Sequence, residues 1–180
     1  GDDITPQIAH MTTVSASLLQ KRLKQFKKQS VEWVVLEVTS HALAQHRTFG
    51  VPIEIAVMTN VTHEHLDYHK TFARYLAAKT KLFKLASRVG IINADDPSAN
   101  AFRRSVKRSI SYGIKAGDWR AQDVKLDAQG SDYTAHVGDN SYHMHVNIPG
   151  EFNIYNSLAA AAVGNEVGLT KKQIEQGIAA

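Results

Sequence analysis

The fold class of this 180-residue chain is decided by the run Ile53-Glu-Ile-Ala-Val-Met-Thr-Asn60, the helical pattern over 71–87, and the run Val89-Gly-Ile-Ile-Asn93. Both runs are short, mostly apolar and rich in β-branched residues, which is typical of a strand covered on both faces of a sheet. Apolar residues between them recur every three or four positions, which predicts an amphipathic helix. A strand, a helix and a second strand in this order predict a βαβ unit with a parallel sheet.

The same alternation extends in both directions from this unit. Upstream, the run Val31-Glu-Trp-Val-Val-Leu-Glu-Val38 predicts another buried strand, and it follows a helical pattern over 15–29. Downstream, a helical pattern over 98–107 precedes a short strand over 108–112. We therefore expect an α/β fold with a mostly parallel sheet flanked by helices.

The pattern changes after Gly117. Residues 119–126, 131–137 and 141–148 predict three strands, joined by turn-rich segments at 127–130 and 138–140. Pro149-Gly150 ends this excursion, and helical patterns follow over 152–166 and 171–180. The sequence thus predicts one domain over 1–180, with a small antiparallel β subregion over 117–149.

Composition excludes several classes of protein. The chain has no Cys, which excludes a disulfide scaffold, a Cys-ligated metal site and a thiol nucleophile. No apolar run approaches the ~20 residues that cross a bilayer, and no signal peptide is visible. The net charge of +4 comes mainly from two helix-like stretches, 21–28 and 103–108, which we interpret as solvated helix faces. We expect a cytoplasmic protein that does not bind nucleic acid.

Polar residues gather where the predicted parallel strands end, and open α/β sheets bind ligands beyond those carboxyl ends. Glu37 could hold Mg²⁺ near a phosphate there, or it could simply reach solvent. His63, His65 and His69 follow the 53–60 run; with Asp67 they could ligate zinc from a loop, or they could pack that loop. A third polar group, after the 89–93 run, consists of Asn93, Asp95 and Asp96.

Lys79 is unusual because it falls on the apolar stripe of the 71–87 helix, between Leu76 and Phe83. A lysine that faces a core is costly unless it is paired or neutralised. Its stem could instead snorkel to water, or a desolvated Lys79 near a metal could be carbamylated to a carboxylate. No G-x-x-x-x-G-K-[ST] pattern occurs, so a Walker-type phosphate loop is not complete in this chain.

Together these segments resemble the central domain of the Mur ligase family, and within it the MurE branch. The resemblance rests on Leu36-Glu-Val-Thr-Ser-His-Ala-Leu-Ala-Gln-His-Arg47, Met58-Thr-Asn-Val-Thr-His-Glu-His-Leu-Asp-Tyr-His69 and Tyr75-Leu-Ala-Ala-Lys-Thr-Lys-Leu-Phe83, with further matches at 93–97 and 149–160. It implies the P-loop NTPase-like middle domain of an ATP-dependent amide ligase. Such a ligase adds a diamino acid to UDP-N-acetylmuramoyl-dipeptide in peptidoglycan synthesis, through an acyl phosphate.

The resemblance also implies a role for individual residues. Glu37 and His65 match the protein ligands of two Mg²⁺ ions, and Lys79 matches a lysine that is carbamylated to hold the second ion. These three residues are the expected catalytic and metal-binding set. The positions that match contacts to the UDP-muramoyl-peptide are Thr12, Thr13, Thr39, Gln45 and Arg47. Asn153 and Asn156 match asparagines near the adenine of ATP, whereas the resemblance gives no role to Asn93, Asp95 and Asp96.

The family's phosphate loop, expected upstream of Thr12, and its C-terminal domain have no counterpart in this chain. We therefore expect a truncated middle domain that is inactive alone and works with N- and C-terminal domains of its parent protein. Three alternatives stay open: a Mur-type ligase with another acceptor, a non-catalytic Mur-like binding module, and a zinc hydrolase built on the histidines. The joint presence of Glu37, His65 and Lys79 argues against the binding module.

Overall fold

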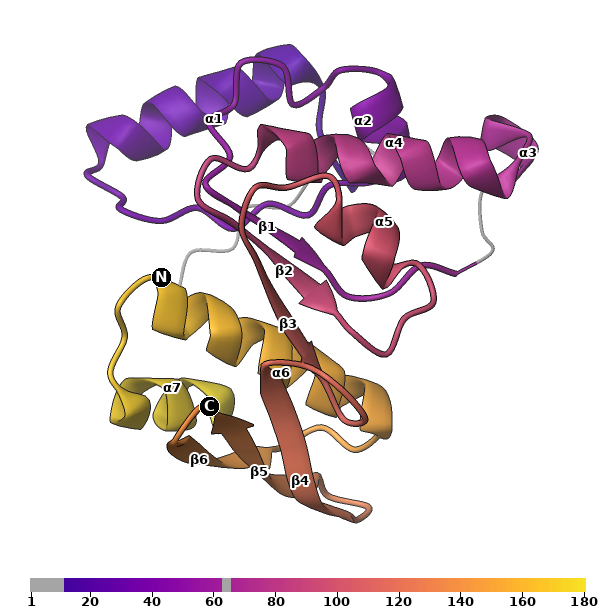
Figure 1. The fold of residues 1–180 in the computed structure, drawn as a ribbon. Coiled ribbons are helices and arrows are strands. Elements are labelled where there is room, and N and C mark those ends of the chain that lie inside the picture. The colour runs from indigo at the N-terminus through magenta and orange to yellow at the C-terminus, as the bar shows by residue number, and fades with distance from the viewer. Residues whose placement is uncertain (1–11, 63–65) are drawn as a thin grey trace.

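The computed structural model describes residues 12–62 and 66–180 (Figure 1). Its centre is a six-stranded sheet of order β1-β2-β3-β4-β5-β6. Parallel pairing joins β1 (Ile55–Met58), β2 (Val89–Asn93), β3 (Ser109–Gly113) and the start of β4 (Trp119–Leu126). Antiparallel pairing then adds β5 (Ser131–Val137) and β6 (Asn140–Val146). The predicted mostly parallel sheet with an antiparallel subregion is confirmed.

The helices follow the predicted patterns closely, with two short additions. The structure has α1 (Ala16–Lys28), α2 (Ser40–Ala44), α3 (Leu66–His69), α4 (Phe72–Leu85), α5 (Ala99–Arg103), α6 (Glu151–Glu166) and α7 (Lys171–Ile178). Hydroxyl side chains cap four of them by accepting a backbone N–H in the first turn: Ser15, Thr39, Thr71 and Thr170. The sequence patterns did not predict α2 and α3, and α5 is shorter than the predicted 98–107.

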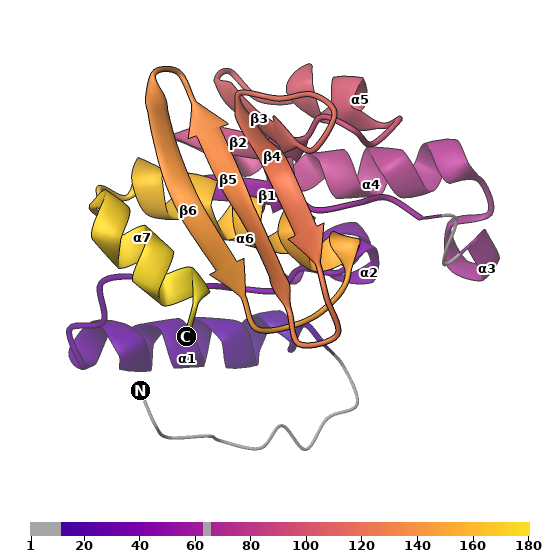
Figure 2. The same cartoon turned by 90° about the horizontal axis from the view of Figure 1, so that it is seen from below.

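Helices cover both faces of the sheet at β1 and β2, whereas β4, β5 and β6 are open on the face turned away from α6 (Figures 1 and 2). On one face, α6 buries Ile154 and Leu158 against β2 to β6. On the other, Phe83 of α4 and Phe102 of α5 pack against β1 and β2. Gly90 is required on that face, because a Cβ there would lie 2.7 Å from the Phe83 ring. Burial on both faces explains why β1 is apolar throughout and why β2 is apolar up to its last residue, Asn93.

The predicted strand over 31–38 was wrong. No described strand pairs with this segment, and within the described chain the backbone of 32–36 makes no hydrogen bond. Val31, Trp33 and Val34 are 43–49% exposed, and Val35 is 96% exposed. β-branched residues favour a strand only where a neighbouring strand supplies hydrogen bonds and a packed face. The described residues supply neither, so the segment stays an exposed apolar surface.

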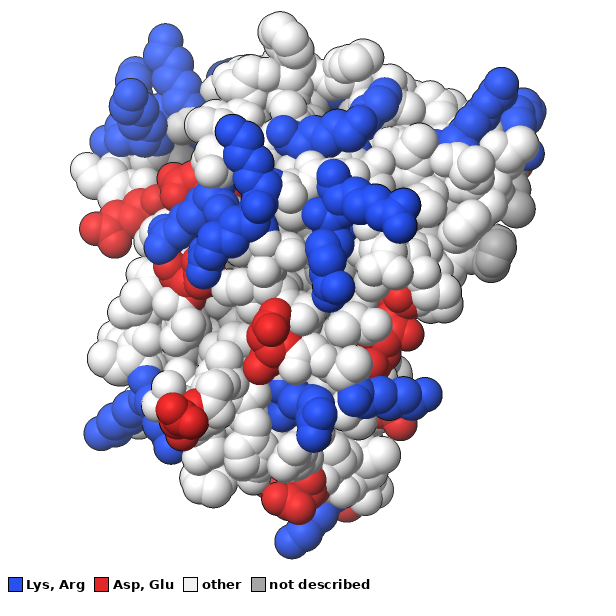
Figure 3. Space-filling view, in the orientation of Figure 1, with Lys and Arg blue, Asp and Glu red and all other residues white. Residues whose placement is uncertain are grey.

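The basic residues lie on the surface, as expected. Lys21, Lys24, Lys27 and Lys28 are exposed on α1, and Arg103, Arg104, Lys107 and Arg108 are exposed at and after α5. Figure 3 shows Lys and Arg side chains in both halves of this face, with uncharged residues and some Asp and Glu between them. Within the described residues, no helix has both the length and the apolar character needed to cross a membrane.

Candidate active site

Arg47 is the centre of the first group of predicted site residues. Its Nε and Nη2 atoms donate hydrogen bonds of 3.0 and 2.6 Å to Oε1 of Gln45, and its Nη1 donates one of 2.7 Å to the carbonyl oxygen of Thr13. These bonds hold the planar guanidinium in one orientation just after α2. The structure thus brings together Thr13, Gln45 and Arg47, which are 34 residues apart at the extremes.

Thr13 is buried, and its hydrogen bonds join its own segment to the Glu37–Thr39 turn. Its hydroxyl donates to the carbonyl oxygen of Glu37 at 3.0 Å and accepts from the backbone N–H of Thr39 at 3.1 Å. The side chain of Thr39 in turn caps α2 by accepting from Ala42 N–H. Thr12, the residue before Thr13, is exposed. In this geometry Thr12 can meet a ligand, while the side chain of Thr13 positions the Glu37–Thr39 turn.

A cluster of rings connects this group to α4. Nε2 of Gln45 donates to the hydroxyl of Tyr68 at 3.5 Å, and the Tyr68 ring lies 4.2 Å from the His41 ring. Nε2 of the buried His69 shares a 3.0 Å hydrogen bond with Oγ of Ser40. His69 also lies 5.4 Å from the ring of Tyr75 on α4. These contacts tie α2, α3 and α4 together beside Arg47.

Lys79 lies one turn beyond Tyr75 on α4. It is half-buried, and its Nζ is 5.2 Å from the centre of the Tyr75 ring. The carboxylate of Glu37 is exposed and makes no hydrogen bond or ion pair to another described residue. His63 and His65 lie outside the described residues. Of the predicted set of Glu37, His65 and Lys79, the structure therefore describes only Glu37 and Lys79. The Glu37 carboxylate is the type of oxygen ligand that Mg²⁺ prefers, whereas Lys79 as an unmodified amine supplies none.

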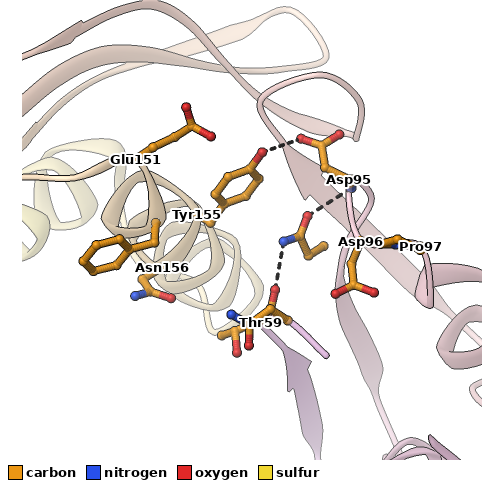
Figure 4. Close-up of a pocket in the computed structure, with 10 residues that line it drawn as sticks. Thr59, Asp95, Asp96, Pro97, Glu151, Tyr155 and Asn156 are labelled. Carbon is orange, nitrogen blue, oxygen red and sulfur yellow. Dashed lines mark hydrogen bonds between the residues drawn. The ribbon is translucent and has the colours of Figure 1, made fainter. Parts of the chain in front are cut away.

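A pocket of about 450 Å³ opens at the carboxyl ends of β1 and β2 (Figure 4). Its walls come from the ends of these strands and from the first turns of α6. The lining residues are Thr59, Asn60, Asn93, Asp95, Asp96, Pro97, Glu151, Phe152, Tyr155 and Asn156. A concave site with two aromatic rings and a few amide and carboxyl groups suits a small polar ligand with a planar ring.

Hydrogen bonds of Asn93 and Asp95 connect the end of β1, the end of β2 and α6, which form the walls of the pocket. Nδ2 of Asn93 donates to the carbonyl oxygen of Thr59 at 2.8 Å, and Oδ1 of Asn93 accepts from Asp95 N–H at 3.0 Å (Figure 4). The Asp95 carboxylate accepts from the Tyr155 hydroxyl at 3.0 Å and from three backbone N–H groups over 114–116. Burial raises the pKa of Asp95, but these hydrogen bonds outweigh burial, so the pKa is lowered. Burial and the bond to Asp95 raise the pKa of Tyr155 to about 12.

Asp96 holds the segment that follows β1 against the turn before α5. Its Oδ2 accepts from Val61 N–H at 2.8 Å, and its Oδ1 accepts from Ser98 N–H at 2.7 Å. Asp96 therefore joins the end of β1 to the turn before α5.

The family model of the Mur ligase middle domain matches residues 3–164 of the chain. The chain belongs to the Mur ligase family. Two similar proteins carry names of the form UDP-N-acetylmuramoyl-L-alanyl-D-glutamate--2,6-diaminopimelate ligase. The one from Clostridium acetobutylicum is 33% identical, and the match covers 94% of this chain and 36% of the relative. The one from Chlamydia pneumoniae is 42% identical, and the match covers 83% of this chain and 32% of the relative. A solved ligase structure of that name matches 99% of the chain and 38% of its own, at 29% identity and a TM-score of 0.88. The chain spans about a third of the length of these relatives.

In this Mur ligase domain the two asparagines predicted near adenine occupy different places. Asn156 is exposed and lines the pocket, whereas Asn153 is buried and donates to the carbonyl oxygen of Pro149 at 2.9 Å. Asn153 therefore fastens the start of α6, and it does not line the pocket. The sequence analysis did not single out Phe152 and Tyr155. Their place beside Asn156 at the start of a predicted helix was the signal that could have indicated them.

The structure describes only part of the predicted zinc site. Among residues 12–62 and 66–180, no three His, Asp or Glu side chains come close enough to hold a metal ion. His69 is turned toward Ser40 and Tyr75 inside the ring cluster. The backbone carbonyl oxygen of Asp67 accepts a hydrogen bond of 2.8 Å from Nζ of Lys70, directly after α3.

Proposed function

We propose that this chain is the middle domain of an ATP-dependent amide ligase of the MurE type, and that the parent protein works in the cytoplasm. The parent enzyme would join a diamino acid, 2,6-diaminopimelate in the named relatives, to UDP-N-acetylmuramoyl-L-alanyl-D-glutamate. The observation that carries this proposal is the Arg47 guanidinium, held by Gln45 and Thr13 beside the Glu37 turn. A guanidinium oriented in this way is suited to hold a carboxylate or a phosphate by paired hydrogen bonds.

Three groups of residues would share the proposed reaction. Thr12, Thr39, Gln45 and Arg47 would hold the UDP-muramoyl-dipeptide, while Asn156, Phe152 and Tyr155 would receive the nucleotide base of ATP. Glu37, His65 and a carbamylated Lys79 would hold two Mg²⁺ ions. Mg²⁺ bound there would neutralise negative charge on the phosphoryl group during its transfer.

The reaction would be an amide ligation in two steps. The substrate carboxylate takes the γ-phosphoryl group of ATP, which releases ADP and gives an acyl phosphate. The amine of the diamino acid then attacks the acyl carbon, loses a proton and displaces phosphate. Arg47 would orient the substrate carboxylate for the first step, because holding reacting groups in line lowers the barrier to transfer.

Because the chain spans about a third of the named relatives, we propose that it turns over no ATP by itself. Its parent would supply the phosphate loop and the part that selects the amino acid. The Mur-type ligase with a different acceptor is the second candidate, because membership of the Mur ligase family does not by itself fix the amine that is added.

A two-ligand titration of the ¹⁵N-labelled chain tests the proposal. ADP with Mg²⁺ should shift the amides that line the pocket, around Thr59 and Asn156. UDP-N-acetylmuramoyl-L-alanyl-D-glutamate should shift a different set, around Thr39 and Arg47. Failure of both ligands to bind would contradict the proposal, and stoichiometric zinc in the purified chain would favour the hydrolase instead.

A further inference from the structure

Asp95 lines the pocket, and its carboxylate accepts four hydrogen bonds from the protein itself. Oδ2 accepts hydrogen bonds from Ile114 N–H at 2.8 Å, Lys115 N–H at 2.9 Å and the Tyr155 hydroxyl at 3.0 Å, and Oδ1 accepts from Ala116 N–H at 3.0 Å. Three of the four donors share Oδ2, so this oxygen is committed to the protein, whereas Oδ1 accepts only one. The observed hydrogen bonds of Asp95 therefore serve the structure of the pocket.

The turn between β3 and β4 is built around this carboxylate. Three successive backbone N–H groups point at it, which is the arrangement of an anion-binding nest. Gly113 starts the turn, and a Cβ there would lie 2.4 Å from the carbonyl oxygen of Ala116 and 2.7 Å from Oδ2 of Asp95. The turn and the carboxylate are therefore packed without room for a larger residue.

The fourth donor, Tyr155, links the same carboxylate to the ligand-facing helix. Tyr155 is half-buried on α6, one residue before Asn156, and its ring forms part of the pocket wall (Figure 4). The hydroxyl bond to Asp95 spans 60 residues of sequence. Through Asn93, Asp95 is also joined to Thr59 at the end of β1. The carboxylate of Asp95 thus joins α6 to the 114–116 turn, and its backbone N–H joins both to Asn93 and the end of β1.

We propose that Asp95 is a positioning residue of the nucleotide pocket: it holds the Tyr155 ring as the wall against which the base of ATP packs, and it couples that wall to the 113–116 turn. The proposal rests on the proposed ATP site. The requirement is for a carboxylate, since an amide at this position would turn an NH₂ group toward N–H donors. Loss of the Tyr155 hydroxyl would release the ring while leaving the turn in place.

Calorimetric titration with ADP and Mg²⁺ tests the role of Tyr155, with Tyr133→Phe as the matched control. Tyr133 also makes one hydroxyl hydrogen bond to α6, to Ser157 at 2.7 Å, but its ring is buried away from the pocket. Tyr155→Phe should weaken ADP binding roughly three- to tenfold, the range that one net hydrogen bond corresponds to. Tyr133→Phe should lower stability to urea and leave ADP affinity unchanged.

Hydrogen exchange supplies a readout local to Asp95. Asp95→Asn should weaken ADP binding and speed amide exchange at Ile114, Lys115 and Ala116, whereas Tyr155→Phe should leave those amides protected. Equal ADP affinity in the wild type and Tyr155→Phe would overturn the proposal, and so would equal weakening by Tyr133→Phe. Absence of ADP binding by the wild type would instead overturn the proposed function, and this inference with it.

Discussion

Nη1 of Arg47 donates a hydrogen bond of 2.7 Å to the carbonyl oxygen of Thr13, across 34 residues of sequence. Nε and Nη2 of the same guanidinium both donate hydrogen bonds to Oε1 of Gln45. Thr13 in turn holds both sides of the Glu37–Thr39 turn. A side chain restrained in this way loses little further rotamer freedom on binding, which favours recognition of an anionic group.

Lys79 should accept carbon dioxide selectively. In bicarbonate at mildly alkaline pH, the neutral amine would attack CO₂, lose a proton and become a carbamate. Intact-mass measurement should show the gain of one CO₂ in the wild type, and Lys79→Arg should abolish it. Lys81, exposed two residues further on, provides the control, because Lys81→Arg should keep the adduct. A wild type that stays unmodified would count against the carbamylated site.

The ion pair of Arg108 with Glu166 should make stability depend on acid. Arg108 donates two hydrogen bonds of 2.6 and 2.9 Å to the Glu166 carboxylate, and Arg88 donates to its backbone carbonyl. The bonds from Arg108 lower the pKa of Glu166 below its ordinary 4.5 against the opposing effect of burial. The stabilisation is therefore present above that ordinary value and is lost as pH falls through the lowered one.

Urea unfolding of Glu166→Gln between pH 7 and pH 3 checks this dependence. At pH 7 the variant should be less stable by about 0.5–1 kcal/mol, a small value because the Arg108 side chain is 55% exposed. The difference should shrink as the pH falls, whereas Asp139→Asn at an exposed turn should show no such trend. A difference that stays constant or grows in acid would refute the assignment.

The exposed segment 31–38 should make the chain self-associate. Over 32–36 the backbone makes no hydrogen bond to another described residue, and unpaired backbone groups beside exposed apolar side chains form a template for pairing with another strand. Light scattering during size-exclusion chromatography should show association that increases with concentration and that Val35→Lys reduces. Phe49→Lys is the control, because Phe49 is 80% exposed but lies outside this segment. A wild type that remains monomeric at high concentration would contradict this prediction.

The sequence predicted the elements whose formation depends on local pattern and burial. β2 has the predicted bounds, because all five of its residues are buried and the run is apolar up to its last residue, Asn93. α4 differs from its prediction by one or two residues, with Thr71 as its cap. Lys79 is half-buried on the stripe where the helical spacing placed it.

Features that depend on distant partners could not be predicted in the same way. The run 31–38 has the composition of a strand, but composition does not show whether a neighbouring strand is present. Asn153 and Asn156 are the same residue type one turn apart, and only the packing of α6 separates their roles. Asp95 receives donors from a turn about 20 residues away and from a helix 60 residues away, which no local motif reveals.

Arg47→Lys should show whether the oriented guanidinium recognises the substrate. Lysine keeps the positive charge but cannot donate in two directions from one plane. We expect affinity for UDP-N-acetylmuramoyl-L-alanyl-D-glutamate to fall at least about tenfold, as for the loss of one charge-assisted hydrogen bond. Stability should change little, because Arg47 is only half-buried.

The most direct test of the central claim is therefore calorimetric binding of UDP-N-acetylmuramoyl-L-alanyl-D-glutamate to the wild type and to Arg47→Lys. UDP-N-acetylmuramic acid without the dipeptide serves as the ligand control. The account predicts saturable binding of the dipeptide form by the wild type, and a large loss of that affinity in the variant. Equal affinities of the two proteins, or no binding by the wild type, would contradict it.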